Sequence, residues 1–150
     1  MQKFIVLITI ILSVFVTACY ASDENNIQAN PLTNPKSILS KRSVYFDSDS
    51  YIVKPIYAPL IAAHAQYLIG HPQARVTLQG NTDERGTREF NLSAGLLRAI
   101  AIKNALLQLG VPDDQIETTS LGEENPLEFG HNETAWKQNR RTEIIYQIEQ

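Results

Sequence analysis

An acidic residue, an amide and an arginine lie at spacings that suit a binding site for a small ligand with two opposite charges. Asp83 lies in the stretch Gly80-Asn81-Thr82-Asp83-Glu84-Arg85-Gly86-Thr87, where a glycine at each end allows the backbone to turn tightly. A helix is predicted to follow, so this loop leads Asp83 toward a helix N-terminus, whose unpaired N–H groups favour a carboxylate.

The same helix would carry the other two groups. Asn91 and Arg98 are seven positions apart and therefore project from nearly the same helix face, with Gly95 between them leaving bare backbone in the predicted groove. A ligand with an ammonium and a carboxylate on one centre would match this set, with Asp83 contacting the ammonium and Arg98 the carboxylate. Spacing alone leaves an alternative open, in which Asp83 caps a turn and Arg98 pairs with it or with Glu89.

The elements that would position these residues follow from the apolar and turn-forming patterns. Strands are predicted at 43–46, 75–79, 116–121 and 142–148, and helices at 55–70, 88–109 and 133–140. Thr87 is suited to cap the long helix and Gly110 to follow its end. The predicted apolar stripe of this helix comprises Leu92, Leu96, Ala99, Ile102, Leu106 and Leu109. The order β-α-β-α-β-(α)-β predicts an α+β fold, a mixed sheet with helices on one face, stabilised in part by Ile144 and Trp136.

The N-terminal segment has the pattern of a lipidated export signal. Lys3 precedes an uncharged, mostly apolar run over residues 4–18 that is short for a transmembrane helix. The ending Val16-Thr17-Ala18-Cys19 resembles the lipobox of bacterial lipoproteins, which implies cleavage after residue 18 and lipidation of Cys19. Tyr20, which is not aspartate, resembles the outer-membrane sorting pattern. We therefore expect a signal peptide at 1–18, the lipidated cysteine with a flexible tether at 19–40, and a folded domain at 41–150.

The composition argues against several other classes of protein. The chain has 16 acidic and 13 basic residues and a formal net charge of −3, which does not suit binding to nucleic acid. The three histidines, His64, His71 and His131, lack metal-ligand spacing, and the sequence has no nucleophile-elbow or P-loop motif. We therefore expect neither an enzyme nor a metal or other cofactor.

Several motifs together resemble the OmpA C-terminal-like domain, most closely its peptidoglycan-associated lipoprotein (Pal) branch. The resemblance covers about residues 43–148. The matching motifs are, in chain order, Val44-Tyr45-Phe46-Asp47, Gly80-x-Thr82-Asp83-Glu84-Arg85-Gly86-Thr87, Glu89-Phe90-Asn91, Ser93, Gly95, Arg98-Ala99, Gly110-Val111-Pro112-x-Asp114-Gln115-Ile116, Leu121-Gly122-Glu123-x-x-Pro126, Gly130-His131 and Asn139-Arg140-Arg141.

The resemblance implies a function and a set of site residues. In that family, the residues matching Asp83 and Arg98 hold the diaminopimelate residue of the peptidoglycan stem peptide, and residues matching Thr82, Asn91, Asn139 and Arg140 line the pocket. Gly95 is assigned to the same site. The implied protein is a lipoprotein of the outer membrane whose domain faces the periplasm, binds peptidoglycan non-covalently and tethers the membrane to the cell wall, with TolB of the Tol-Pal system as a further partner.

The sequence also departs from the family pattern. Asn81 replaces the usual His or Tyr, Ala94 a leucine, Arg88 a frequent proline, and Leu96-Leu97 a polar pair. The change at Leu96-Leu97 leaves the ligand-binding pair intact but alters the surface by which Pal meets TolB. An alternative therefore stays open, in which the protein is an OmpA-like assembly component of an envelope complex that binds protein rather than peptidoglycan.

Overall fold

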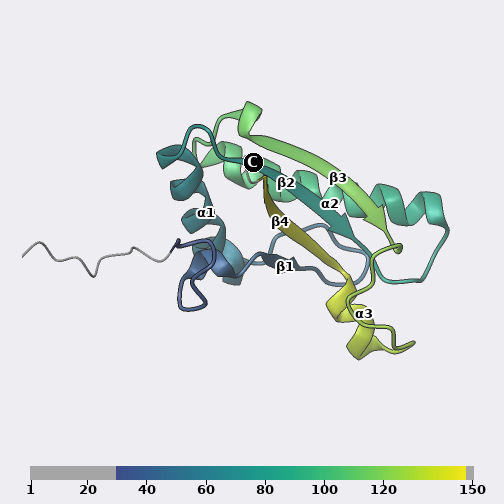
Figure 1. Cartoon of the computed structure of the whole chain (residues 1–150). Coiled ribbons are helices and arrows are strands. Elements are labelled where there is room, and N and C mark those ends of the chain that lie inside the picture. Colours follow the sequence, from purple (N-terminus) through teal and green to yellow (C-terminus); the bar gives the residue numbers. More distant parts are fainter. Residues whose placement is uncertain (1–29, 148–150) are drawn as a thin grey trace, which may run out of the picture.

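The computed structural model describes residues 30–147 of the 150-residue chain (Figure 1). The predicted signal peptide, Cys19 and the first part of the predicted tether lie outside the described residues, as does Ile148 at the end of the last predicted strand. Within residues 30–147, none of the helices combines the length and apolar character that crossing a membrane requires.

Four strands form one mixed sheet. They are β1 (Ser43–Tyr45), β2 (Arg75–Asn81), β3 (Ile116–Gly122) and β4 (Arg141–Gln147), and they lie in the order β1-β4-β2-β3. β2 pairs in parallel with β3, whereas β4 is antiparallel to both β1 and β2. The predicted mixed sheet is therefore confirmed. Because β4 lies between β1 and β2, the last strand of the chain joins the first strand to the rest of the sheet.

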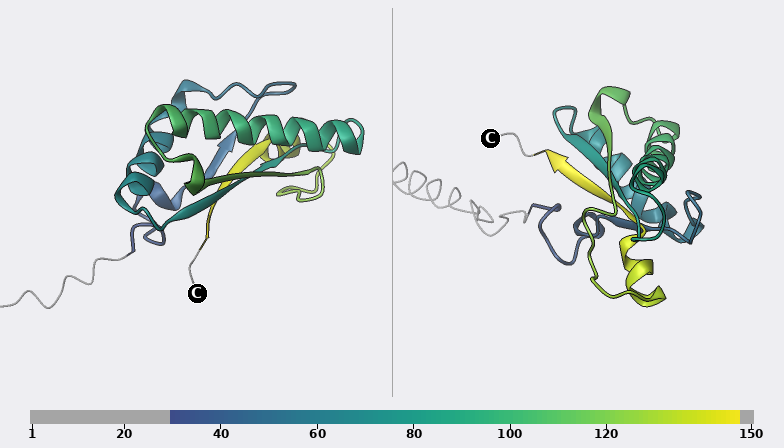
Figure 2. Two further views of the ribbon diagram at one scale, coloured as in Figure 1. Left: turned by 90° about the horizontal axis from the view of Figure 1, so that it is seen from above. Right: turned by 90° about the vertical axis from the view of Figure 1, so that its right-hand side faces the viewer.

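Helices α1 (Ala58–Gly70) and α2 (Arg88–Gln108) cover one face of this sheet (Figures 1 and 2). A short 3-10 helix, η2 (Pro55–Tyr57), leads into α1, and two others are η1 (Ile38–Ser40) and η3 (Asp113–Gln115). The Thr87 hydroxyl accepts the Phe90 N–H at 3.2 Å at the start of α2, and Gly110 follows its end with φ at +93°. The remaining helix, α3 (Glu133–Asn139), lies at the end of the sheet where β4 begins.

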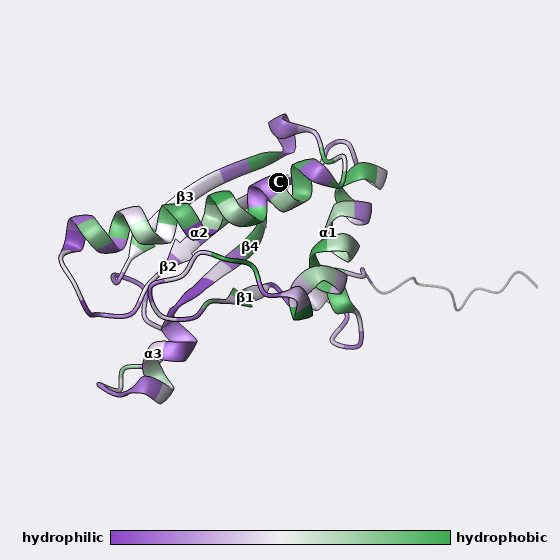
Figure 3. Ribbon diagram, turned by 180° about the vertical axis from the view of Figure 1, so that it is seen from behind, coloured by the Kyte–Doolittle hydropathy of each residue, from purple (hydrophilic) through white to green (hydrophobic). Residues whose placement is uncertain are grey.

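The core lies between the sheet and these two helices. Val76 and Leu78 on β2 and Ile144 on β4 point inward and are fully buried, as their alternation with polar neighbours predicts. Thr77 pairs with Ile145 on the opposite, partly exposed face. Hydropathy changes along the molecule from largely hydrophobic in α1 to hydrophilic in α3 (Figure 3). The end of the sheet beside α3 is therefore its polar end, where a site for a polar ligand is expected.

The predicted apolar stripe of α2 is correct only from Ala99 to Leu106. Ala99, Ile102 and Leu106 are buried, whereas Leu96 and Leu109 are exposed. In the first half, the residues buried on the sheet-facing side are Asn91, Gly95 and Arg98 instead. The first turns of α2 lie over the polar end of the sheet, so the residues that they bury are polar or lack a side chain.

The segment that packs on the domain begins earlier than the predicted boundary at residue 41. Leu39 is buried, and the Ser37 hydroxyl caps η1 by accepting the Leu39 N–H at 3.2 Å. Arg42 donates to the Leu32 carbonyl at 2.9 Å, and Leu32 packs against the core. Apolar side chains of the predicted tether therefore hold residues 32–40 against the domain.

Candidate functional site

A cavity of about 460 Å³ opens at the polar end of the sheet. Four parts of the chain meet there: the loop after β1, the loop between β2 and α2, the first turns of α2, and Arg140 just before β4. Register places the end of β2 beside the start of β4, since Asn81 pairs with Arg141. The lining residues are Ser48, Asp49, Ser50, Tyr51, Thr82, Asp83, Arg85, Gly86, Phe90, Asn91, Ser93, Ala94, Leu97, Arg98 and Arg140.

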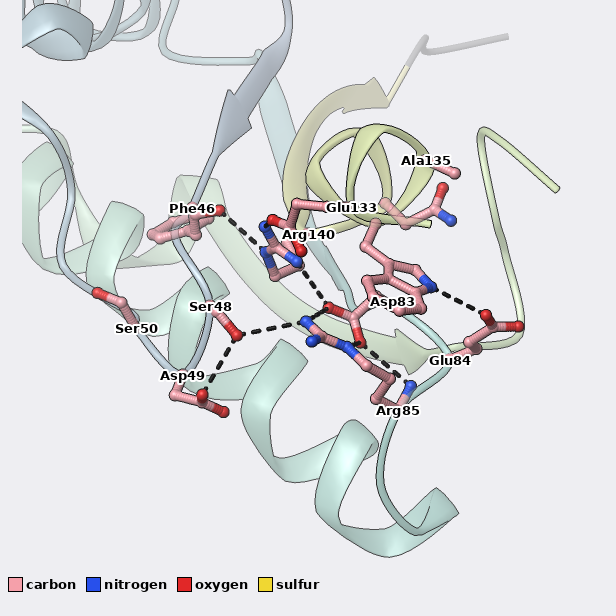
Figure 4. Close-up of polar contacts among 12 residues, drawn as sticks. Phe46, Ser48, Asp49, Ser50, Asp83, Glu84, Arg85, Glu133, Ala135 and Arg140 are labelled. Carbon is pink, nitrogen blue, oxygen red and sulfur yellow. Dashed lines mark hydrogen bonds and ion pairs between the residues drawn. The ribbon is translucent and has the colours of Figure 1, made fainter. Parts of the chain in front are cut away.

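Asp83 is a buried carboxylate held by two arginines (Figure 4). Its oxygens accept from Arg85 N and Nε at 3.1 Å, from Arg85 Nη2 at 2.8 Å, and from Arg140 Nη1 at 2.8 Å. Burial by itself raises the pKa of Asp83, but the hydrogen bonds from Arg85 and Arg140 outweigh it and lower the pKa to about 2. Asp83 is therefore ionised at physiological pH.

Arg98 is a buried cation that has no carboxylate partner among residues 30–147. Its Nε donates to the Ser50 carbonyl at 3.0 Å, its Nη1 donates to the Asn81 carbonyl at 3.2 Å, and its guanidinium lies 5.6 Å from the centre of the Phe46 ring. Within residues 30–147, Arg98 forms no ion pair, although only 4% of its surface is exposed.

The electrostatic surroundings of Arg98 favour an added negative charge. Burial and then repulsion from Arg140 lower the pKa of Arg98 to about 10, although Asp83 and Asp49 attract its charge. An arginine with a pKa of about 10 remains charged at neutral pH. The two carbonyl contacts leave other N–H donors of the guanidinium without a partner among residues 30–147. Because Arg98 lines the cavity, an anion bound there would compensate its buried charge.

Two more predicted residues, Thr82 and Asn91, line the same cavity. Thr82 Oγ1 is buried and has no hydrogen-bond partner among the described residues, which is unusual for a buried hydroxyl. Asn91 donates its side-chain N–H to the Glu123 carboxylate, which fixes the amide at the wall of the cavity. Arg140 is also in place, because its side chain is buried and contacts Asp83.

Gly95 and Asn139 have structural roles that the sequence did not reveal. A Cβ on Gly95 would lie 2.3 Å from Ser120 Oγ and 3.0 Å from the Gly80 carbonyl oxygen, so this glycine faces the sheet rather than the cavity. Asn139 accepts from the Leu127 and Glu128 N–H groups at 2.8 and 2.9 Å and donates to the Glu128 carbonyl. We therefore assign Gly95 to close packing of helix on sheet, and Asn139 to bracing the loop before α3.

The structure adds site residues that sequence reasoning missed. Arg85 contacts Asp83 directly, and its position two residues after Asp83 in a tight loop was the available signal. The segment Ser48–Tyr51 was not assigned to the site from the sequence, yet it forms one wall of the cavity. Trp136, predicted as a core residue, is half-buried beside the site, where its Nε1 donates to Glu84 at 2.9 Å and Arg85 lies over its ring at 4.2 Å.

A mixed four-stranded sheet covered on one face by two helices, with an acidic loop entering the second helix, defines the OmpA-like class of domain. The model of the OmpA family matches residues 45–141, and the chain belongs to this family. The peptidoglycan-associated lipoprotein of Pasteurella multocida (strain Pm70) is 37% identical to the chain over 150 residues, which cover 97% of this chain and 100% of that protein.

Solved structures show the same relationship. The crystal structure of the peptidoglycan-associated lipoprotein from Burkholderia pseudomallei superposes with a TM-score of 0.77 at 55% sequence identity, and the match covers 79% of this chain and 100% of that one. The C-terminal domain of Helicobacter pylori MotB superposes with a TM-score of 0.64 at 20% identity, with 71% of this chain and 83% of that one covered. The second likeness concerns the fold alone.

Proposed function

We propose that this protein binds peptidoglycan non-covalently, with the diaminopimelate residue of a stem peptide in the cavity. Asp83 would contact the ligand ammonium and Arg98 the ligand carboxylate, in a binding rather than a catalytic role. The observation that carries this proposal is Arg98, a buried guanidinium at the cavity without a carboxylate partner among residues 30–147. A carboxylate placed there would gain charge-assisted hydrogen bonds and compensate a buried charge.

The rest of the cavity supports a ligand that carries both charges. Asp83, which binds cations, and Arg98, which has no anionic partner among residues 30–147, line one cavity. A zwitterionic group could therefore contact both at once. The buried hydroxyl of Thr82, which has no partner among residues 30–147, would give one more hydrogen bond to a group that reached it. A simple anion would satisfy only Arg98, and a simple cation only Asp83.

The placement of the protein in the cell is part of the same proposal. Relatives named peptidoglycan-associated lipoproteins match almost the whole chain, including its N-terminal segment. We propose that residues 1–18 are removed, that Cys19 carries the lipid anchor in the outer membrane, and that the domain faces the periplasm and tethers the membrane to the cell wall. TolB, or another Tol protein, is proposed as a further partner.

Co-sedimentation with purified peptidoglycan sacculi tests this function. The full chain in mild detergent would be compared with Arg98→Gln and Asp83→Asn, and with Arg88→Ala as a control, because Arg88 is an exposed cation that pairs with Glu124 and does not line the cavity. We expect wild type and Arg88→Ala to pellet, while the other two lose binding at least about tenfold, the scale of a lost hydrogen bond to a charged group.

A stability control is needed because Asp83 also contacts the buried Arg140. Melting temperatures would show whether each variant is folded at the assay temperature. Normal pelleting of folded Arg98→Gln would contradict the assignment of the cavity. Failure of folded wild type to pellet would contradict peptidoglycan binding and favour the alternative of an envelope adaptor that binds protein.

A further inference from the structure

The position that a ligand ammonium would need beside Asp83 is occupied by the protein's own cation. The guanidinium of Arg85 contacts both carboxylate oxygens, with Nε 3.1 Å from Oδ1 and Nη2 2.8 Å from Oδ2 (Figure 4). Arg140 also donates to Oδ2, at 2.8 Å. With two arginines bound, Asp83 has no strong unmet need for a third cation, so a ligand ammonium must compete with one of them.

The two arginines differ in how firmly they are held. The Arg140 side chain is 3% exposed and also contacts Glu133 Oε1 at 2.6 Å and the Phe46 carbonyl at 3.3 Å. The Arg85 side chain is 43% exposed, and its other hydrogen bond is to Ser48 Oγ at 3.3 Å. Removing Arg140 from Asp83 would expose a buried network, whereas Arg85 can return its charge to solvent at little cost.

We infer that Arg85 is an internal competitor that holds the cation position of Asp83 in the free protein and is displaced by the ammonium of the ligand. This inference rests on the proposed function, which places that ammonium at Asp83. Arg85 is therefore a specificity-determining residue. A neutral group cannot replace a guanidinium in an ion pair with a buried carboxylate, so the exchange selects ligands that bring a positive charge of their own.

The exchange has a spectroscopic consequence because Trp136 is the single tryptophan of the chain. The Arg85 guanidinium lies 4.2 Å from the centre of the Trp136 ring, and Trp136 Nε1 donates to Glu84, the residue between Asp83 and Arg85. When Arg85 leaves Asp83, the cation over the indole moves or reorients. Indole fluorescence therefore reports displacement of Arg85 separately from ligand binding itself.

The test is a titration of the purified full chain in detergent with L-alanyl-γ-D-glutamyl-meso-diaminopimelate, followed by calorimetry and by tryptophan fluorescence. We expect Arg85→Ala to bind the tripeptide about two- to fivefold more tightly than wild type, the range that corresponds to losing a competing exposed ion pair. Wild type should change its fluorescence on binding, and Arg85→Ala should bind without that change. Arg88→Ala, which removes a nearby charge outside the cavity, should match wild type in both respects.

A second ligand isolates the role of the positive charge. The same tripeptide with its free diaminopimelate amine acetylated keeps the carboxylates but cannot replace Arg85. It should bind wild type at least about tenfold more weakly and leave the fluorescence unchanged. For Arg85→Ala this difference between the two tripeptides should persist, because Asp83 still selects a cation.

The outcomes separate the two proposals. If wild type binds neither the tripeptide nor sacculi, the proposed function is wrong and this inference falls with it. If wild type binds and Arg85→Ala binds equally or more weakly, Arg85 is not a competitor and the inference alone is overturned. A fluorescence change that persists in Arg85→Ala would also overturn it, because the signal would then arise elsewhere.

Discussion

Replacing Gly80 with alanine should separate helix α2 from strand β2 and weaken both the fold and the site. A Cβ at this position would lie 1.8 Å from the carbonyl oxygen of Gly95 and 2.3 Å from its carbonyl carbon. Ordinary van der Waals contact begins at 3.4 Å, so the two backbones would have to move apart by about 1.6 Å. Both contacts are with backbone, which no side-chain rotation can relieve.

The loss of stability can be estimated from the tight packing of α2 on β2 at this position. Overpacking a tight interior costs about 1–3 kcal/mol when side chains can adjust, so a backbone clash should cost at least about 3 kcal/mol in the free energy of unfolding. For a domain of this size, that corresponds to a fall in melting temperature of about 10 °C or more. Binding should fall as well, because α2 carries Arg98 and β2 leads to Asp83, and a site tolerates displacements of only about 0.5 Å.

Thermal unfolding followed by circular dichroism would measure the effect, with Gly70→Ala as the matched control. Gly70 ends helix α1, and a Cβ there would meet no described atom within 4 Å. The melting temperature of Gly70→Ala should therefore equal that of wild type or be slightly higher. Should Gly80→Ala fail to fold, Gly95→Ala provides an intermediate case, because its shortest contact is with the hydroxyl of Ser120. A melting temperature of Gly80→Ala equal to that of Gly70→Ala would refute the reasoning.

Two further predictions concern single side chains. Thr82→Val removes a buried hydroxyl that has no partner in the described part of the chain. The variant should therefore have an unchanged or higher melting temperature and bind the tripeptide several-fold more weakly. A lower melting temperature together with normal tripeptide binding would contradict this role. His64 is fully buried between the Tyr146 hydroxyl and the Lys41 carbonyl, and burial lowers its pKa below the ordinary 6.5. The unfolded chain therefore binds a proton more readily, so stability should fall as the pH drops below about 6.5, and denaturant unfolding of His64→Gln should show a smaller fall over that range.

Local patterns were sufficient to predict the four strands and the three α-helices, but not the short 3-10 helices. Alternation of Val76 and Leu78 with polar residues identified β2, and Thr87 with Gly110 marked both ends of α2. These signals lie within a few residues of the feature that they specify, because strand alternation, capping and helix termination are set by neighbouring backbone groups. The resemblance of the Gly80–Thr87 loop also identified the family that the comparisons confirm.

The structure brings the charged residues of the predicted site together, and it differs from the prediction in the placement of Gly95 and Asn139. Asp83, Arg98 and Thr82 line one cavity, as the order of the motifs suggested. Gly95 faces the sheet, because the rotation of a helix about its axis depends on what packs against it. Leu96, predicted as buried, is exposed for the same reason.

What the sequence by itself determined were the strands and α-helices and the order of the charged residues along them. The tertiary structure decided which groups those charges contact. Arg98 donates to Ser50, 48 residues away, and Arg140 contacts Asp83 across 57 residues. Such partners are set by how β1, β2 and β4 meet at one end of the sheet. No local pattern encodes that meeting. Only the folded chain therefore shows that, within residues 30–147, Arg98 has no carboxylate partner while Asp83 has two arginines.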